Sequence, residues 1–161
     1  MAYKIVNGPT FNQDIDETST YQEAPLGTRV QAVDLDNPTR GTGEYVYCLG
    51  AASTAAGDLV TIDGAGFTTT RASANAKGKV GVAMSANVAS QYGWYCVDGT
   101  VPITSGDVAD GAVLYLTATA GSVDDAAVVG DLIYGAFSVA ADAGGTTLSS
   151  ITHPFVTDAS N

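Results

Sequence analysis

Short apolar runs separated by Gly, Asp and Asn recur along the chain from Leu26 onward. Runs of about four to eight residues that are rich in β-branched and aromatic side chains and end at turn residues are typical of β-strands. The sequence Asp63-Gly64-Ala65-Gly66 separates two such runs and is typical of a hairpin turn. The pattern predicts strands over residues 29–33, 44–49, 58–62, 67–71, 80–84, 93–97, 99–103, 113–117, 132–137 and 151–156.

Helical patterns are nearly missing from the sequence. Only residues 85–90 and 123–128 are compatible with a turn or two of helix, and the second range has acids near its N-terminus, as a helix dipole favours. Many short strands at a spacing of about 8–12 residues are typical of a sandwich or a barrel. We therefore expect an all-β fold, a β-barrel or jelly-roll-like sandwich, with little helix and an extended N-terminal arm.

A weak internal repeat in the sequence agrees with this architecture. In residues 57–83 and again in residues 111–136, a strand follows a Gly, a Gly-containing turn follows the strand, and a later Gly lies between apolar residues. Such a Gly permits the kink or close strand approach that barrel corners need. Chance similarity between Gly- and Ala-rich β sequences is the alternative explanation.

The residues before Leu26 lack both a helical stripe and a clean alternation. Their isolated apolar side chains include Tyr3, Ile5 and Phe11, which are suited to packing on a neighbouring surface. We expect residues 1–25 to form an N-terminal arm or loop, which either orders on contact or stays a flexible tail. Residues 26–161 then form a single β-rich domain.

Composition and charge exclude several classes of function. The chain has 161 residues, 6 Lys and Arg against 17 Asp and Glu, and a net charge of −11. A broad positive face for nucleic-acid phosphates or an anionic membrane surface is therefore not expected. The chain also has no apolar run long enough to span a bilayer and no apolar stretch typical of an export signal near Met1, so we expect neither a membrane nor a secreted protein.

The residues suited to catalysis or metal binding are few. His153 is the single histidine, and we expect a structural role for it at a strand end. Cys48 and Cys96 are too distant in sequence for CxxC chemistry, and buried reduced thiols are the expected state, with a disulfide as the alternative. The sequence predicts no catalytic residues, no cofactor, no metal and hence no enzyme.

Four local motifs resemble functional sites without completing one. Gly64-Ala65-Gly66 leads into a β run rather than a helix, so it is not a phosphate loop. Asp34-Leu35-Asp36-Asn37 has the alternate acids of a calcium loop, but Pro38 interrupts it, and only adventitious cation binding stays open. Ser85 lacks the flanking glycines of a nucleophile elbow. Neighbouring acids such as Asp124 and Asp125 are typical of solvated turns.

Aromatic residues are the remaining conspicuous feature, because they lie on the predicted strands or at their edges. Tyrosine and tryptophan both fill cores and anchor protein interfaces. The residues concerned are Tyr45, Tyr47, Tyr92, Trp94, Tyr95, Tyr115 and Tyr134, and core packing is expected for most of them.

Two stretches carry a resemblance to a known family. Residues 80–95, Val-Gly-Val-Ala-Met-Ser-Ala-Asn-Val-Ala-Ser-Gln-Tyr-Gly-Trp-Tyr, and residues 115–125, Tyr-Leu-Thr-Ala-Thr-Ala-Gly-Ser-Val-Asp-Asp, are similar to small structural proteins of tailed bacteriophages. The order of strands, turns and Gly residues over residues 44–137 resembles the capsid cement, or head decoration, proteins. The motifs consist of common β and turn residues and include no catalytic fingerprint.

The resemblance implies a virion protein that is made in the host cytoplasm and binds the outer surface of the assembled phage head. Its partners would be the major capsid protein and two further copies of itself in a homotrimer, and it would stabilise the shell by mass action. We expect Tyr3, Ile5 and Phe11 of the arm to contact a neighbouring subunit or the capsid. Trp94 and Tyr95 are expected to close the core or the trimer seam. A carbohydrate-binding or host-attachment module is the alternative function.

Overall fold

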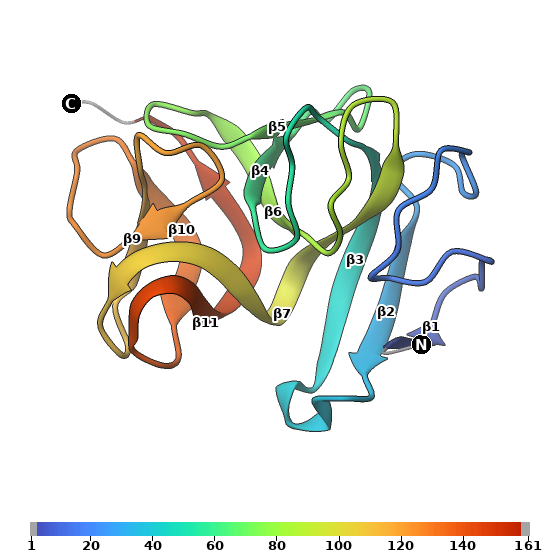
Figure 1. Cartoon of the computed structure of the whole chain (residues 1–161), viewed down its shortest axis with the longest axis horizontal. Helices are drawn as coiled ribbons and strands as arrows, with labels where there is room; N and C mark the ends of the chain where they lie inside the picture. Colours follow the sequence, from blue (N-terminus) through green and yellow to red (C-terminus); the bar gives the residue numbers. More distant parts are fainter. Residues whose placement is uncertain (1–2, 159–161) are drawn as a thin grey trace.

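A computed structural model describes residues 3–158 of the chain (Figure 1). The described residues contain one 3₁₀ turn, η1 (Pro38–Arg40), and no α-helix, which confirms the predicted all-β fold. Residues 85–90 form bends and a turn, and Val123–Asp124 is a strand, so neither predicted helical turn is present. The strands are β1 (Tyr3–Asn7), β2 (Arg29–Asp34), β3 (Thr42–Leu49), β4 (Leu59–Ile62), β5 (Thr69–Arg71), β6 (Gly78–Ala83), β7 (Tyr92–Val108), β8 (Val113–Leu116), β9 (Val123–Asp124), β10 (Leu132–Ser138) and β11 (Asp142–Val156).

The strands belong to one sheet that curls into two rings sharing β7. One ring follows the pairings β7, β9, β8, β10, β11 and back to β7, and occupies the left of Figure 1. The other runs through β3, β7, β6, β4 and β5, and an isolated bridge between Leu49 and Thr68 completes it. Strands β1 and β2 extend from the outer edge of β3. The barrel-like architecture predicted from the strand spacing thus takes the form of two small closed rings.

Strand β7 belongs to both rings, and its pairing partner changes from β3 to β11 at Asp98 and Gly99. Its first part pairs with β3 and β6, and its second part pairs with β11. Gly99 has a φ of +125°, and a Cβ atom there would lie 2.9 Å from the Cα of Gly43. A residue with a side chain would be strained at this position, so glycine allows one strand to replace the two that the sequence predicts over residues 93–97 and 99–103.

Residues 45–48 of β3 and 93–97 of β7 are buried on both faces of the sheet, and successive residues alternate between two cores. On β7, Trp94 and Cys96 belong to the larger core, whereas Tyr95 and Val97 belong to the smaller one. On β3, Tyr45 and Tyr47 join the larger core, with Val46 and Cys48 in the smaller. The near-continuous apolar runs of these two strands follow from this two-sided burial.

The weak internal repeat corresponds to a four-residue turn that recurs throughout the fold. Gly57 and Gly111 each occupy the third position of a four-residue turn, have a positive φ and precede a strand. The same hydrogen bond, from the amide of the fourth residue to the carbonyl of the first, is present in turns 25–28, 55–58, 109–112, 119–122 and 128–131. A positive φ at the third position is the requirement of a type II turn, which explains why Gly recurs there.

Candidate functional site

The N-terminal segment, expected to be an arm or loop, is integrated into the domain. Tyr3–Asn7 is a strand that pairs with β2, and Ile15 is 1% exposed in the larger core. The side chain of Gln13 accepts a hydrogen bond from the Tyr47 hydroxyl and donates one to the carbonyl of Tyr92. Residues 8–25 therefore cover the face of β3 and β7 that would otherwise expose Tyr47 and Trp94. The first two residues of the predicted arm lie outside the described range.

The three predicted contact residues of this segment face the chain's own core. Tyr3 packs edge-on against Tyr45, with 5.8 Å between ring centroids, and Phe11 lies 5.9 Å from the ring of Trp94. Ile5 is half-buried against the same core. Each side chain keeps part of its surface exposed, and a contact with a neighbouring subunit or capsid stays a prediction.

Trp94 and Tyr95 are fully buried within a single chain. Their neighbouring positions on β7 send them to opposite cores, so the structure does not bring them together as one site. The Tyr95 hydroxyl accepts a hydrogen bond from Asn87 Nδ2 at 2.8 Å and lies 3.3 Å from Thr69 Oγ1. Burial raises the pKa of Tyr95. Neither side chain offers surface to a partner in this structure.

An exposed apolar face lies on the outside of the β8–β10–β11 wall. Val113, Tyr134, Phe137 and Phe155, which together define the apolar face, are 51%, 40%, 47% and 44% exposed. Phe137 is in register with Val113, and Tyr134 is in register with Phe155. The rings of Tyr134 and Phe155 stack with 5.0 Å between centroids and 10° between planes. Two cross-strand pairs thus place four large apolar side chains on one outer surface of the sheet.

A bulge at Gly135 sets the direction of the β10 side chains. Gly135 has a φ of +78°, and the register with β11 shifts between Tyr134 and Ala136. From one pair to the next β10 advances two residues and β11 advances four, and the in–out alternation of β10 is interrupted at Gly135, so Ala136 is buried while Tyr134 and Phe137 are both exposed. Without the bulge, strict alternation would place Tyr134 and Phe137 on opposite faces. Gly135 is the sequence signal for this face, although core packing was the expectation for most of the strand aromatics, a set that includes Tyr134.

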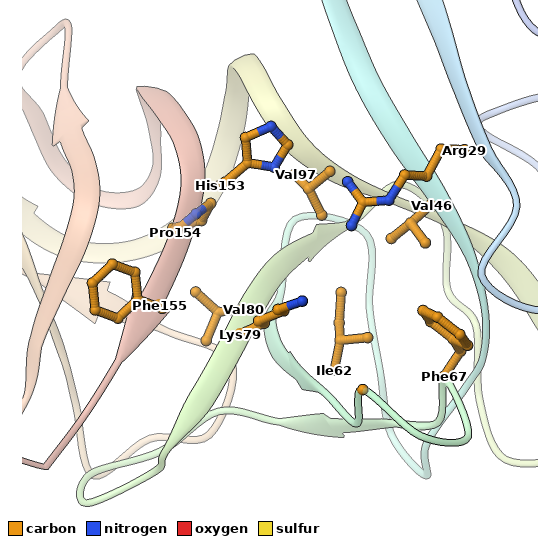
Figure 2. A pocket seen from close by; sticks show the side chains of 11 residues that line it. Arg29, Val46, Ile62, Phe67, Lys79, Val80, Val97, His153, Pro154 and Phe155 are labelled. Atoms are coloured by element: carbon orange, nitrogen blue, oxygen red, sulfur yellow. The ribbon is translucent and has the colours of Figure 1, made fainter.

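A pocket of about 390 Å³ adjoins the apolar face, because Phe155 belongs to both (Figure 2). Strands β2, β3, β4, β6, β7 and β11 all contribute to its walls. We call it the basic pocket, because Arg29, Lys79 and His153 surround an apolar lining. That lining consists of Val46, Ile62, Phe67, Val80, Val97, Pro154 and Phe155. No local sequence pattern indicates this pocket, because its residues come from six strands and from the turn between β4 and β5.

His153 lies where β11 changes partners, rather than at a strand end. The pairing of β11 with β7 ends at Thr152, and its pairing with β6 begins at Phe155. His153 has a φ of +41°, and its Nε2 is 4.0 Å from Glu44 Oε2 and 3.9 Å from Asp98 Oδ2. Glu44 also accepts a hydrogen bond from Arg29 Nη1. The imidazole is 53% exposed, so charge pairs at this position are weakened by solvent.

The two cysteines are free and buried. Cys48 belongs to the smaller core and Cys96 to the larger, on opposite faces of the β3–β7 pair, which excludes a disulfide between them in this fold. Burial raises the pKa of each thiol to about 12, with a favourable contact from Arg29 partly offsetting this at Cys48. The expected reduced, buried thiols are confirmed, and both will be poor nucleophiles at neutral pH.

The candidate calcium loop is closed by its own residues. Asp34 accepts hydrogen bonds from the amides of Asp36 and Asn37, and its other oxygen bonds to Asn37 Nδ2 and to Arg40. Both oxygens of this carboxylate therefore accept hydrogen bonds within the turn, which includes η1. Among residues 3–158, no group of three or more His, Cys, Asp or Glu side chains is arranged to hold a metal ion.

Comparison with models of known protein families finds no match, and comparison with curated proteins finds no significantly similar sequence. Within the described residues, no helix has the length and apolar character needed to cross a membrane.

Proposed function

We propose that the chain is a non-catalytic structural protein of a phage virion that binds the outer surface of the assembled capsid. The observation that carries this proposal is the apolar face of Val113, Tyr134, Phe137 and Phe155. Exposed aromatic side chains held on a rigid sheet are the usual anchors of a protein interface. The resemblance of residues 44–137 to capsid cement proteins is the ground for proposing a major capsid protein as the partner.

The construction of the apolar face supports binding without rearrangement. Its side chains sit on paired strands, and the Tyr134–Phe155 stack fixes two of the rings before any partner arrives. Preorganised side chains lose less conformational entropy on binding, so more of the contact free energy appears as affinity. A homotrimer, as the resemblance suggests, would multiply a modest contact through effective concentration.

Carbohydrate binding is the second candidate, because Tyr134 and Phe155 are exposed aromatic rings. Their mutual stacking at 5.0 Å covers one face of each ring, which leaves less flat surface for a sugar than two separate rings would. The apolar neighbours Val113 and Phe137 add no hydrogen-bonding groups beside them. The arrangement therefore favours a protein partner.

The test mixes the purified chain with emptied heads of the phage that encodes it and measures co-sedimentation. The wild-type chain should co-sediment, and Phe137→Thr should lose at least about tenfold in affinity, as expected for an interface anchor. Leu35→Thr is the matched control, since Leu35 is 51% exposed but lies outside the apolar face. Absence of binding by the wild type, or equal binding by both variants, would contradict the proposal. Binding to a glycan array instead of heads would support the second candidate.

A further inference from the structure

The basic pocket has the size and lining of a ligand site rather than of a packing defect. Its volume of about 390 Å³ lies in the range of small-molecule pockets, roughly 300–1,000 Å³. Buried side chains from separate strands form its floor, among them Val46, Ile62 and Val97. A floor built from several paired strands keeps its shape, so the site is formed before a ligand arrives.

The charged side chains that line the pocket are basic, although the molecule as a whole is acidic. The chain has 6 Lys and Arg and a net charge of −11, yet Arg29 and Lys79 both line this one pocket. Figure 2 shows their side chains extending over it from opposite sides. Arg29 is partly neutralised by Glu44, whereas Lys79 has no carboxylate within 4.0 Å among the described residues. A single anionic group on a ligand would give Lys79 the charge partner that it lacks within the chain.

The apolar floor specifies the rest of the ligand. A bare inorganic anion would leave Ile62, Phe67 and Val97 without a partner, and a neutral hydrocarbon would leave Lys79 without one. Glu44 and Asp98 on the His153 side of the pocket disfavour a second negative charge there. A ligand that satisfies all three conditions carries a single negative charge, as a carboxylate does, and an apolar tail.

We propose that the basic pocket binds an apolar monocarboxylate, with its tail against Ile62, Phe67 and Val97 and its carboxylate between Lys79 and Arg29. The carboxylate accepts charge-assisted hydrogen bonds from both cations, and the Arg29 guanidinium has N–H groups beyond the one that bonds to Glu44. This site does not depend on capsid binding. The same chemistry is present in a free fatty or aromatic acid and in the C-terminal carboxylate of a peptide that ends in an apolar residue.

The experiment follows the methyl resonances of Val46, Ile62, Val80 and Val97 by NMR during titrations. Octanoate and 3-phenylpropionate represent free acids, and acetyl-Gly-Leu-Phe represents a peptide C-terminus. Each is compared with the corresponding primary amide, which keeps the tail and removes the charge. The acids should shift these methyl resonances in a saturable way and bind about tenfold more tightly than the amides. If the free acids bind more tightly than the peptide, the natural ligand is a free acid. If the peptide binds more tightly, the ligand is a peptide C-terminus.

Two variants test whether Lys79 binds the carboxylate of the ligand. Lys79→Gln should lower the affinity for the acids about tenfold and leave that for the amides unchanged. Lys77→Gln is the matched control, because Lys77 lies two residues away and pairs with Asp158 outside the pocket, and it should bind the acids as the wild type does. The proposal is overturned if no titrant moves the floor resonances at millimolar concentration, if amides bind as tightly as acids, or if Lys79→Gln binds the acids normally. None of these results depends on capsid binding.

Discussion

The Tyr47 hydroxyl donates a 2.6 Å hydrogen bond to Gln13 Oε1, across 34 residues of chain. Gln13 is 4% exposed, and its Nε2 donates to the carbonyls of Glu17 and Tyr92. One side chain thus satisfies polar groups on the N-terminal segment, β3 and β7 together. Because an unsatisfied buried polar group is costly, this contact fixes the segment over the larger core.

Gln13→Ala should therefore lower the free energy of unfolding by about 2–4 kcal/mol, since it leaves the buried Tyr47 hydroxyl without an acceptor and removes one of the two hydrogen bonds to the Tyr92 carbonyl. Urea denaturation measures the change. Asn12→Ala is the control, because Asn12 is exposed, and it should stay within about 0.5 kcal/mol of the wild type. Equal stability of the two variants would show that residues 8–25 do not help to hold the core.

Trp94→Ala should destabilise the chain by about 3–5 kcal/mol, because it empties the largest fully buried side-chain volume of the larger core. Tyr21→Ala removes an aromatic ring that is 76% exposed, and it should change stability by less than about 0.5 kcal/mol. Thermal unfolding of the two variants checks the difference. A Trp94→Ala variant as stable as Tyr21→Ala would contradict the assignment of Trp94 to the core.

Gly135→Ala should cost about 1–3 kcal/mol, because φ at this position is +78° and the new Cβ atom would lie 2.6 Å from the carbonyl oxygen of Thr152. The same substitution at Gly64 meets nothing within 4 Å, so Gly64→Ala should be close to neutral. Chemical denaturation compares the pair. Similar stabilities would mean that the bulge between Tyr134 and Ala136 tolerates a side chain, and its role in forming the apolar face would be lost.

The buried thiols predict a loss of stability in alkali. Burial raises the pKa of Cys48 and Cys96 to about 12, from an ordinary value of 9.0. Between these values the unfolded chain loses thiol protons that the folded chain retains, so stability is full below about pH 9 and falls as the pH rises toward 12. Burial also raises the pKa of Tyr3 to about 12, which adds to the loss above pH 10.

Urea midpoints measured from pH 7 to 11 check the direction, and a thiol reagent at pH 8 gives a second readout. The native chain should react slowly at both cysteines, and the unfolded chain should expose two reactive thiols. Fast reaction of the native chain, or a urea midpoint that does not fall above pH 9, would contradict the burial of these groups.

The strands that the sequence predicts best are those with dense apolar runs. Val30, Leu59 and Leu114 lie on strands expected from periodicity, and each is buried as expected. The first part of β11 was missed because residues 142–150 are mostly Gly, Ala, Ser and Thr. Its pairing with β7 creates a strand that local propensity does not encode. Strand β1 was missed for a similar reason, since Tyr3 and Ile5 become half-buried only against β2 and β3.

The candidate site was less accessible to sequence reasoning than the fold. The aromatic content indicated a binding surface, but whether Trp94 or Tyr134 is exposed depends on which face of its strand is covered. Residues 8–25 bury Trp94, and the bulge at Gly135 exposes Tyr134. The basic pocket depends on six strands that meet only in the folded chain. A local pattern does not record such long-range pairing.

Oxidative footprinting of the chain, free and bound to emptied heads, tests the central claim most directly. The account predicts that hydroxyl-radical labelling of Tyr134, Phe137 and Phe155 falls several-fold on the heads, while Tyr21, 76% exposed and outside the apolar face, is labelled as before. Unchanged labelling of these three residues in the bound chain, or protection of Tyr21 instead, would contradict attachment through the apolar face.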